Sequence, residues 1–134
     1  MTHSAAEGCF QDAAGDVSTV AKGILGENAA VRYLEENGYS VVDRNFRIRE
    51  GEIDIIAEKG ETLVFVEVKS LPHGSPELLA HELDSRKQKK IVKTSKCYLQ
   101  NHRQYNDKFI RYDVLALDVP GLDPVHHIEN AFSE

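Results

Sequence analysis

The sequence contains little cysteine and no long apolar run, and each shortage excludes a class of protein. Its 134 residues include two cysteines, Cys9 and Cys97, and neither lies in a CxxC pair or at a zinc-like spacing from a histidine. We therefore predict two free thiols and no zinc site. No apolar run approaches the roughly 20 residues that span a bilayer, and the N-terminus lacks the basic-then-apolar order of a signal peptide. A cytoplasmic protein that does not enter a membrane is expected.

An excess of positive charge is missing as well, which argues against the simplest kind of nucleic-acid binder. The formal net charge is -6, whereas phosphate binding normally relies on lysine and arginine replacing counterions. Glu7, Asp12 and Asp16 precede the first lysine, Lys22, so half of the excess negative charge belongs to the N-terminal segment. Some of the remaining acids are carboxylates that a metal site would need. An acidic chain can therefore still carry a locally basic binding face.

The pattern along the chain predicts a disordered tail over residues 1–21 and one domain over residues 22–134. Helical spacing of apolar residues predicts a first helix that ends at Asn37 and Gly38, and a long second helix over residues 77–101. Alternating apolar residues predict strands at 39–48, 53–56, 63–70 and 109–117, with room for a short last strand at 126–128. This order, α-β-β-β-α-β with an optional final strand, is typical of an α/β domain whose central mixed sheet is flanked by helices.

Charged residues interrupt two strands that are otherwise apolar. Asp54 lies between two isoleucines, and Glu67 and Lys69 alternate with valines. Because side chains alternate across a strand, Glu67 and Lys69 project from the same face. If the two strands form a tight hairpin, Asp54 lies on the neighbouring strand close to both. We therefore expect two carboxylates and a lysine to point into one small volume.

These residue types suit a hard divalent cation. Mg²⁺ and Mn²⁺ take oxygen ligands, which Asp54 and Glu67 can supply, whereas zinc would favour histidine or cysteine. A nearby lysine can stabilise charge that develops on a phosphate. The alternative is an edge hairpin with a solvated charged face and a surface salt bridge. We favour a site that hydrolyses phosphodiester bonds, because both carboxylate strands are apolar and a helical glutamate lies upstream.

The two strands that carry these charged residues resemble those of a known family. The run GEIDII at 51–56, followed by LVFVEVK at 63–69, resembles the PD-(D/E)xK nuclease superfamily. More closely, it resembles the small bacterial YraN family, also called UPF0102, which is similar in fold to archaeal Holliday junction resolvases. The likeness extends from Lys22 to Phe132, including Gly26 and Glu27 on the first helix and the strand that begins with Arg111.

The resemblance implies a restriction-endonuclease-like core and a role for each site residue. It implies that Asp54 and Glu67 are metal ligands, that Lys69 is the catalytic lysine, and that Glu27 is an additional catalytic carboxylate. Ile53 stands where the superfamily name has proline. That position shapes the backbone and holds no metal, so the departure weakens the assignment to this superfamily only slightly.

Further candidates surround this site. Six basic residues fall within eleven positions of the second helix, with no acid among them. They predict contacts with a nucleic-acid backbone, a solvated helix face being the alternative; the residues assigned to this surface are Arg86, Lys87, Lys89, Lys90 and Lys93. Gln88 and Glu52 are weaker candidates, and Glu52 fits a solvated hairpin charge better. Asp113 fits a structural hydrogen bond as well as a site role, and the pair His126 and His127 is left unassigned.

The leading hypothesis is a metal-dependent nuclease, an endonuclease-like hydrolase that acts on branched or structured DNA rather than RNA. Its predicted cofactor is Mg²⁺ or Mn²⁺. The alternative is a non-catalytic module with a nuclease-like fold that binds nucleic acid or a protein partner. Analogy with the resolvases also suggests a homodimer.

Overall fold

The computed structural model describes the backbone from Val17 to Glu134 and the side chains from Leu25 onward. Residues 1–16 lie outside the described residues, so for them the predicted tail stays a prediction, whereas residues 17–21, which the prediction also placed in the tail, belong to the first helix. In chain order the elements are α1 (Val17–Glu36), β1 (Ser40–Ile48), β2 (Gly51–Lys59), β3 (Thr62–Ser70), α2 (Pro76–Glu82), α3 (Ser85–Asn101), the 3-10 turn η1 (Arg103–Tyr105), β4 (Phe109–Leu117) and β5 (Val125–Phe132). The predicted α/β class is confirmed.

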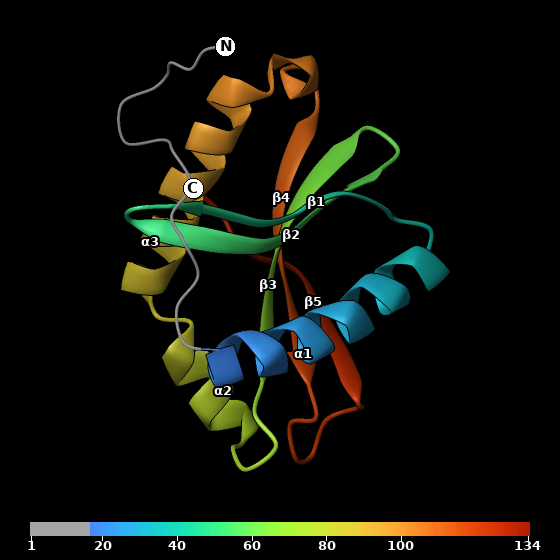
Figure 1. Ribbon diagram of the computed structural model, residues 1–134, viewed down its shortest axis with the longest axis vertical. Helices are drawn as coiled ribbons and strands as arrows, with labels where there is room; N and C mark the ends of the chain where they lie inside the picture. The colour runs from blue at the N-terminus through green and yellow to red at the C-terminus, as the bar shows by residue number, and fades with distance from the viewer. Residues whose placement is uncertain (1–16) are drawn as a thin grey trace.

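One five-stranded sheet forms the centre of the molecule, with the strands in the order β1-β2-β3-β4-β5 (Figure 1). Strands β3 and β4 run parallel, and every other neighbouring pair runs antiparallel. The sheet is therefore mixed, as predicted. A parallel pair needs a long crossover connection, which α2 and α3 supply between β3 and β4.

The two faces of the sheet bury different sets of apolar residues. Leu63 and Phe65 of β3 pack in a cluster with Ile91 and Tyr98 of α3. Val64 and Val66 of the same strand pack in a second cluster with residues of α1, among them Ala30 and Leu34. Because neighbouring residues of a strand point to opposite faces, α1 and α3 cover opposite sides of the sheet (Figure 1). Among the described residues, no helix combines the length and the apolar character that a membrane crossing requires.

The single helix predicted over residues 77–101 is wrong, because two helices occupy this region. Helix α2 ends at Glu82, and α3 begins after Asp84, whose backbone is extended. The Asp84 carboxylate accepts a hydrogen bond from the Lys87 backbone N–H at 3.0 Å, which is the N-cap arrangement of a new helix. Strands β2 and β5 are also longer than the 53–56 and 126–128 segments that were predicted.

The turn between β1 and β2 lies directly against α3. A Cβ atom at Gly51 would lie 2.7 Å from the Thr94 hydroxyl oxygen and 3.4 Å from the Lys90 carbonyl oxygen. Thr94 is fully buried, so only a residue without a side chain allows this approach. The contact ties the end of the β1-β2 hairpin, next to Asp54, to the basic helix.

The prediction of free thiols is wrong for Cys97, which lies on α3 and is disulfide-bonded. It is largely buried, with 8% of its surface exposed. Cys9, the only other cysteine of the sequence, lies outside the described residues.

Candidate active site

Asp54 and Glu67 lie side by side at the point where β2 and β3 separate. The pairing of these strands runs from Lys59 and Thr62 as far as Ile55 and Val66, so Asp54 and Glu67 occupy the next positions. The Asp54 carboxylate oxygen Oδ2 accepts a hydrogen bond from the Val68 backbone N–H at 2.7 Å. This bond fastens the carboxylate to the residue between Glu67 and Lys69. The hairpin thus brings these three residues together.

The two carboxylates are costly to ionise in this place. Burial raises the pKa of Asp54 well above its usual range, the negative charge of Glu67 raises it further, and the Val68 hydrogen bond opposes the rise only in part. Burial also raises the pKa of Glu67, which is 5% exposed, although Lys87 and Lys69 lower it. Two adjacent carboxylates whose charges are poorly compensated would be stabilised by a cation. Their oxygen atoms suit Mg²⁺ or Mn²⁺ better than zinc, which favours histidine and cysteine ligands.

Lys69 is close to this pair, but its ammonium is held by another acid. Its Nζ atom lies 2.9 Å from Oε1 of Glu82, at the end of α2. Partial burial alone would lower the pKa of Lys69. The contact with Glu82, followed by the charges of Glu67 and Asp54, outweighs burial and raises the pKa. The lysine therefore stays charged beside the carboxylates.

Glu27 approaches the site from α1 and is tied to strand β1. Its side chain is buried, and its Oε1 atom accepts hydrogen bonds from Nε of Arg44 at 2.9 Å and from Nδ2 of Asn45 at 2.8 Å. Asn45 adopts a left-handed backbone conformation, with φ of 55°, which an asparagine tolerates. The charge of Glu27 contributes to the raised pKa of Asp54, so the two are electrostatic neighbours.

Glu27 does not complete a set of three metal ligands. Within the part of the chain that the structure describes, no three acidic, histidine or cysteine side chains are grouped closely enough to hold a metal ion. The described acidic side chains that could hold a metal here are thus the pair Asp54 and Glu67, and other ligands, such as water or substrate, would have to complete the coordination. Mg²⁺ is commonly bound in this way, through one or two carboxylates.

The two weaker candidates make structural contacts. Glu52 pairs with Arg47 on β1, directly across the hairpin, at 2.5 Å. The Gln88 amide nitrogen donates to the Leu83 carbonyl oxygen at 2.8 Å and so closes the end of α2. Both side chains are engaged outside the carboxylate pair.

The basic residues of α3 extend from the site along the helix. Lys87, in the first turn, places its Nζ atom 3.4 Å from Oε2 of Glu67. Arg86, Lys89 and Lys90 are exposed and form no ion pair with any residue in the described range 25–134. Further along, a groove of about 460 Å³ lies between α3 and the C-terminal residues, and it is lined by Ser85, Gln88, Lys89, Val92, Lys93, Lys96, Ser133 and Glu134.

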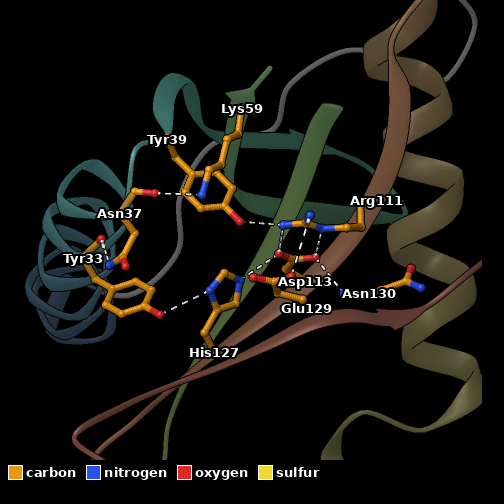
Figure 2. A network of polar contacts seen from close by, with 9 residues as sticks. All are labelled: Tyr33, Asn37, Tyr39, Lys59, Arg111, Asp113, His127, Glu129 and Asn130. Carbon is orange, nitrogen blue, oxygen red and sulfur yellow. Dashed lines mark hydrogen bonds and ion pairs between the residues drawn. The ribbon is translucent and has the colours of Figure 1, made fainter. Parts of the chain in front are cut away.

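Asp113 belongs to a separate polar network on the α1 side of the sheet (Figure 2). It is fully buried and accepts two hydrogen bonds from Arg111, at 2.9 and 2.8 Å, and one from the Asn130 backbone N–H at 2.9 Å. His127 Nε2 lies 2.7 Å from Asp113 Oδ2. Burial would raise the pKa of Asp113, but these partners outweigh it and lower the pKa. Arg111 also donates to the Tyr39 hydroxyl oxygen at 2.6 Å, so the network joins β4 and β5 to the residue that directly precedes β1.

Sequence reasoning missed the contacts of Lys87 with Glu67 and of Glu82 with Lys69. Lys87 is one of six basic residues on its helix, and nothing in the sequence distinguishes it from its neighbours. Glu82 lies thirteen positions after Lys69 in an unremarkable segment. Both contacts depend on how α2 and α3 pack against β3.

Comparison with known proteins identifies relatives over most of the chain. The model of a family described as "Uncharacterised protein family UPF0102" matches residues 26–117. A UPF0102 protein of Geobacter metallireducens is 45% identical over 113 residues, covering 82% of this chain and 90% of the relative. A UPF0102 protein of Persephonella marina is 43% identical over 83% of this chain and 92% of the relative. A UPF0102 protein of Treponema pallidum is 46% identical over 71% of this chain and 75% of the relative. The range matched by the family model contains every residue of the candidate site.

Proposed function

The chain belongs to the UPF0102 family, and we propose that it is a metal-dependent nuclease that hydrolyses phosphodiester bonds in branched or structured DNA. The observation that carries this proposal is the pair Asp54 and Glu67. They are adjacent carboxylates with raised pKa values, and two lysines lie beside them. Perturbed carboxylates of this kind are concentrated at functional sites.

A restriction-endonuclease-like core is the fold we propose for this site. In support, the β2-β3 hairpin carries Asp54, Glu67 and Lys69, and α1 brings Glu27 to the same region. The mixed sheet with helices on both faces is compatible with such a core. The position of Ile53 before Asp54 is fully buried, as a position that shapes the core should be.

Each side chain has a distinct task in this proposal. Asp54 and Glu67 would hold Mg²⁺ or Mn²⁺, and a bound metal would supply Lewis-acid polarisation of a phosphoryl oxygen. Lys69 carries the positive charge that stabilises negative charge developing on the phosphate. Glu27 holds Arg44 and Asn45 through hydrogen bonds and adds negative potential at Asp54.

The basic face of α3 supplies the affinity for nucleic acid. Arg86, Lys89 and Lys90 project from the helix whose first turn reaches Glu67, so a backbone bound along them leads to the carboxylates. Phosphate contacts of this kind fix the position of the nucleic acid and read no sequence. Selection would then rest on the shape of the substrate, as a preference for branched DNA requires.

The second candidate is a binding module without turnover. Two contacts favour it: Glu82 holds the motif lysine, Lys69, at 2.9 Å, and Lys87 occupies one oxygen of Glu67. In such a module, metal affinity would have no need of Asp54. Titrating Mn²⁺ against the wild type and Asp54→Ala separates the two functions, because the nuclease requires an affinity that this substitution removes.

A direct test incubates the protein with linear, flapped and four-way DNA and with RNA in Mg²⁺ or Mn²⁺. We expect cleavage of branched DNA, and we expect Glu67→Gln to reduce the rate by about 100-fold or more, as loss of a charge-stabilising group does. Glu58→Gln is the matched control, because Glu58 lies on β2 in a surface pair with Lys108 at 3.2 Å. It should cleave like the wild type. An intact panel in both metals would contradict the proposal.

A further inference from the structure

Two lysines flank Glu67, and they are engaged differently. Lys69, the motif lysine, directs its ammonium to Glu82, which lies outside the carboxylate pair, at 2.9 Å. Lys87 directs its ammonium to Glu67 itself, at 3.4 Å. The Glu67 side chain is 6% exposed and that of Lys87 is 34% exposed, so Lys87 connects a buried ligand to the solvent-facing side of the site.

The backbone of Lys87 is anchored independently of its side chain. Its N–H donates to the Asp84 carboxylate, the N-cap of α3, at 3.0 Å. Any residue at this position can keep that hydrogen bond, because it involves only the backbone. The ammonium can therefore leave Glu67 while the helix stays in place.

A divalent cation and the Lys87 ammonium compete for the same carboxylate. Like charges a few ångströms apart repel one another strongly at a protein surface, and a divalent ion doubles the repulsion that a single charge would cause. A metal held by Asp54 and Glu67 would therefore drive the ammonium away from Glu67. The displaced Lys87 ammonium would still lie near the first turn of α3, which also carries the exposed Arg86 and Lys89.

We propose that Lys87 is a positioning residue that holds Glu67 in the metal-free protein, is displaced by the metal, and then pairs with a phosphate of the bound nucleic acid. The second half of this inference rests on the proposed nuclease function. The first half concerns metal binding alone. The lysine thus keeps the buried carboxylate compensated until a metal and a phosphate arrive together.

The test compares the full chain with its Lys87→Met variant in two titrations. In the first, Mn²⁺ binding is measured by calorimetry, and we expect the variant to bind Mn²⁺ about tenfold more tightly because the competing ammonium is gone. In the second, four-way DNA is titrated with Ca²⁺ in place of Mg²⁺. Here we expect binding to weaken at least threefold, and we expect Lys87→Arg to restore it.

The opposite signs of the two effects distinguish this role from a structural one, because a damaged fold would weaken both titrations. Lys96→Met is the matched control on the same helix. The Lys96 side chain is 54% exposed and pairs with Glu134 near the C-terminus, so Mn²⁺ affinity should stay within twofold. Should Lys87→Met fold poorly, Lys87→Gln replaces it, since both residues favour helix.

Each outcome decides the inference. Unchanged or weaker Mn²⁺ binding by the Lys87 variant overturns it, and so does a wild-type protein that binds no Mn²⁺. Unchanged DNA affinity overturns the second half. A protein that binds Mn²⁺ in the predicted way but cleaves no substrate refutes the nuclease function and leaves the competition between Lys87 and the metal established.

Discussion

Replacing Asp54 by asparagine should stabilise the metal-free protein, although it removes the centre of the candidate site. Asparagine keeps a side-chain oxygen that can accept the 2.7 Å hydrogen bond from the Val68 N–H. What disappears is a charge that burial and Glu67 both disfavour. Active-site groups held in unfavourable surroundings commonly cost stability in this way.

How the free energy of unfolding changes with pH follows from the pKa of Asp54, which is higher in the folded chain than in the unfolded one. In the interval between those two values the folded state binds more protons, so the free energy of unfolding falls as pH rises. This contribution is fully present below the ordinary aspartate pKa and is lost above the raised one. Each tenfold difference in proton affinity amounts to about 1.4 kcal/mol. We expect Asp54→Asn to gain roughly 1 to 3 kcal/mol at pH 8 and much less at pH 4.

The assay is urea unfolding in EDTA at pH 4, 6 and 8, with Glu58→Gln as the control. That substitution breaks only the surface pair with Lys108 and should change stability by less than about 1 kcal/mol. Saturating Mn²⁺ should reverse the order of stability. At 100 times its dissociation constant a ligand adds about 2.7 kcal/mol to the wild type, and the variant should gain little. An Asp54→Asn protein less stable than the wild type at pH 8 in EDTA would refute the reasoning.

Two further predictions concern the scaffold. Asp113→Asn should cost about 3 to 5 kcal/mol in chemical unfolding, because it leaves buried partners of a fully buried carboxylate uncompensated; Glu129→Gln, which removes only a 3.9 Å contact of Arg111, is its control and should cost under about 1 kcal/mol. Gly51→Ala should cost about 1 to 3 kcal/mol, because its Cβ atom would lie 2.7 Å from the Thr94 hydroxyl. Adding Thr94→Ala should recover part of that loss, and strictly additive costs would argue against the clash.

The predicted strands and the carboxylate hairpin depend on local patterns, which is why the sequence could indicate them. Alternation along 63–69 places Glu67 and Lys69 on one face, and the short loop at Gly60 and Glu61 brings Asp54 to the adjacent strand. The division between α2 and α3 was not predicted, because Leu79 and Leu83 continue the helical apolar period through the break. An N-cap at Asp84 interrupts the helix there despite that period.

The roles of Asp54 and Asp113 could not be told apart from the sequence, because they depend on contacts with residues elsewhere in the chain. Asp113 interrupts an apolar strand as Asp54 does, and the sequence alone did not separate a site residue from a structural one. In the structure the two aspartates have different partners. Asp113 is surrounded by Arg111, His127 and a backbone N–H, which lower its pKa, whereas Asp54 has one backbone donor and the charge of Glu67, and its pKa is raised.

The sequence by itself determined the class of fold, the family, and the residue types of the candidate site, because each of these is encoded in short periodic segments. Only the tertiary structure decided which lysine touches which acid. Lys69 is held by Glu82, and Lys87, twenty positions beyond Glu67, reaches that carboxylate instead. These contacts are made across the space between β3 and the helices. The packing of α2 and α3 on the sheet sets that space, and no local pattern specifies it.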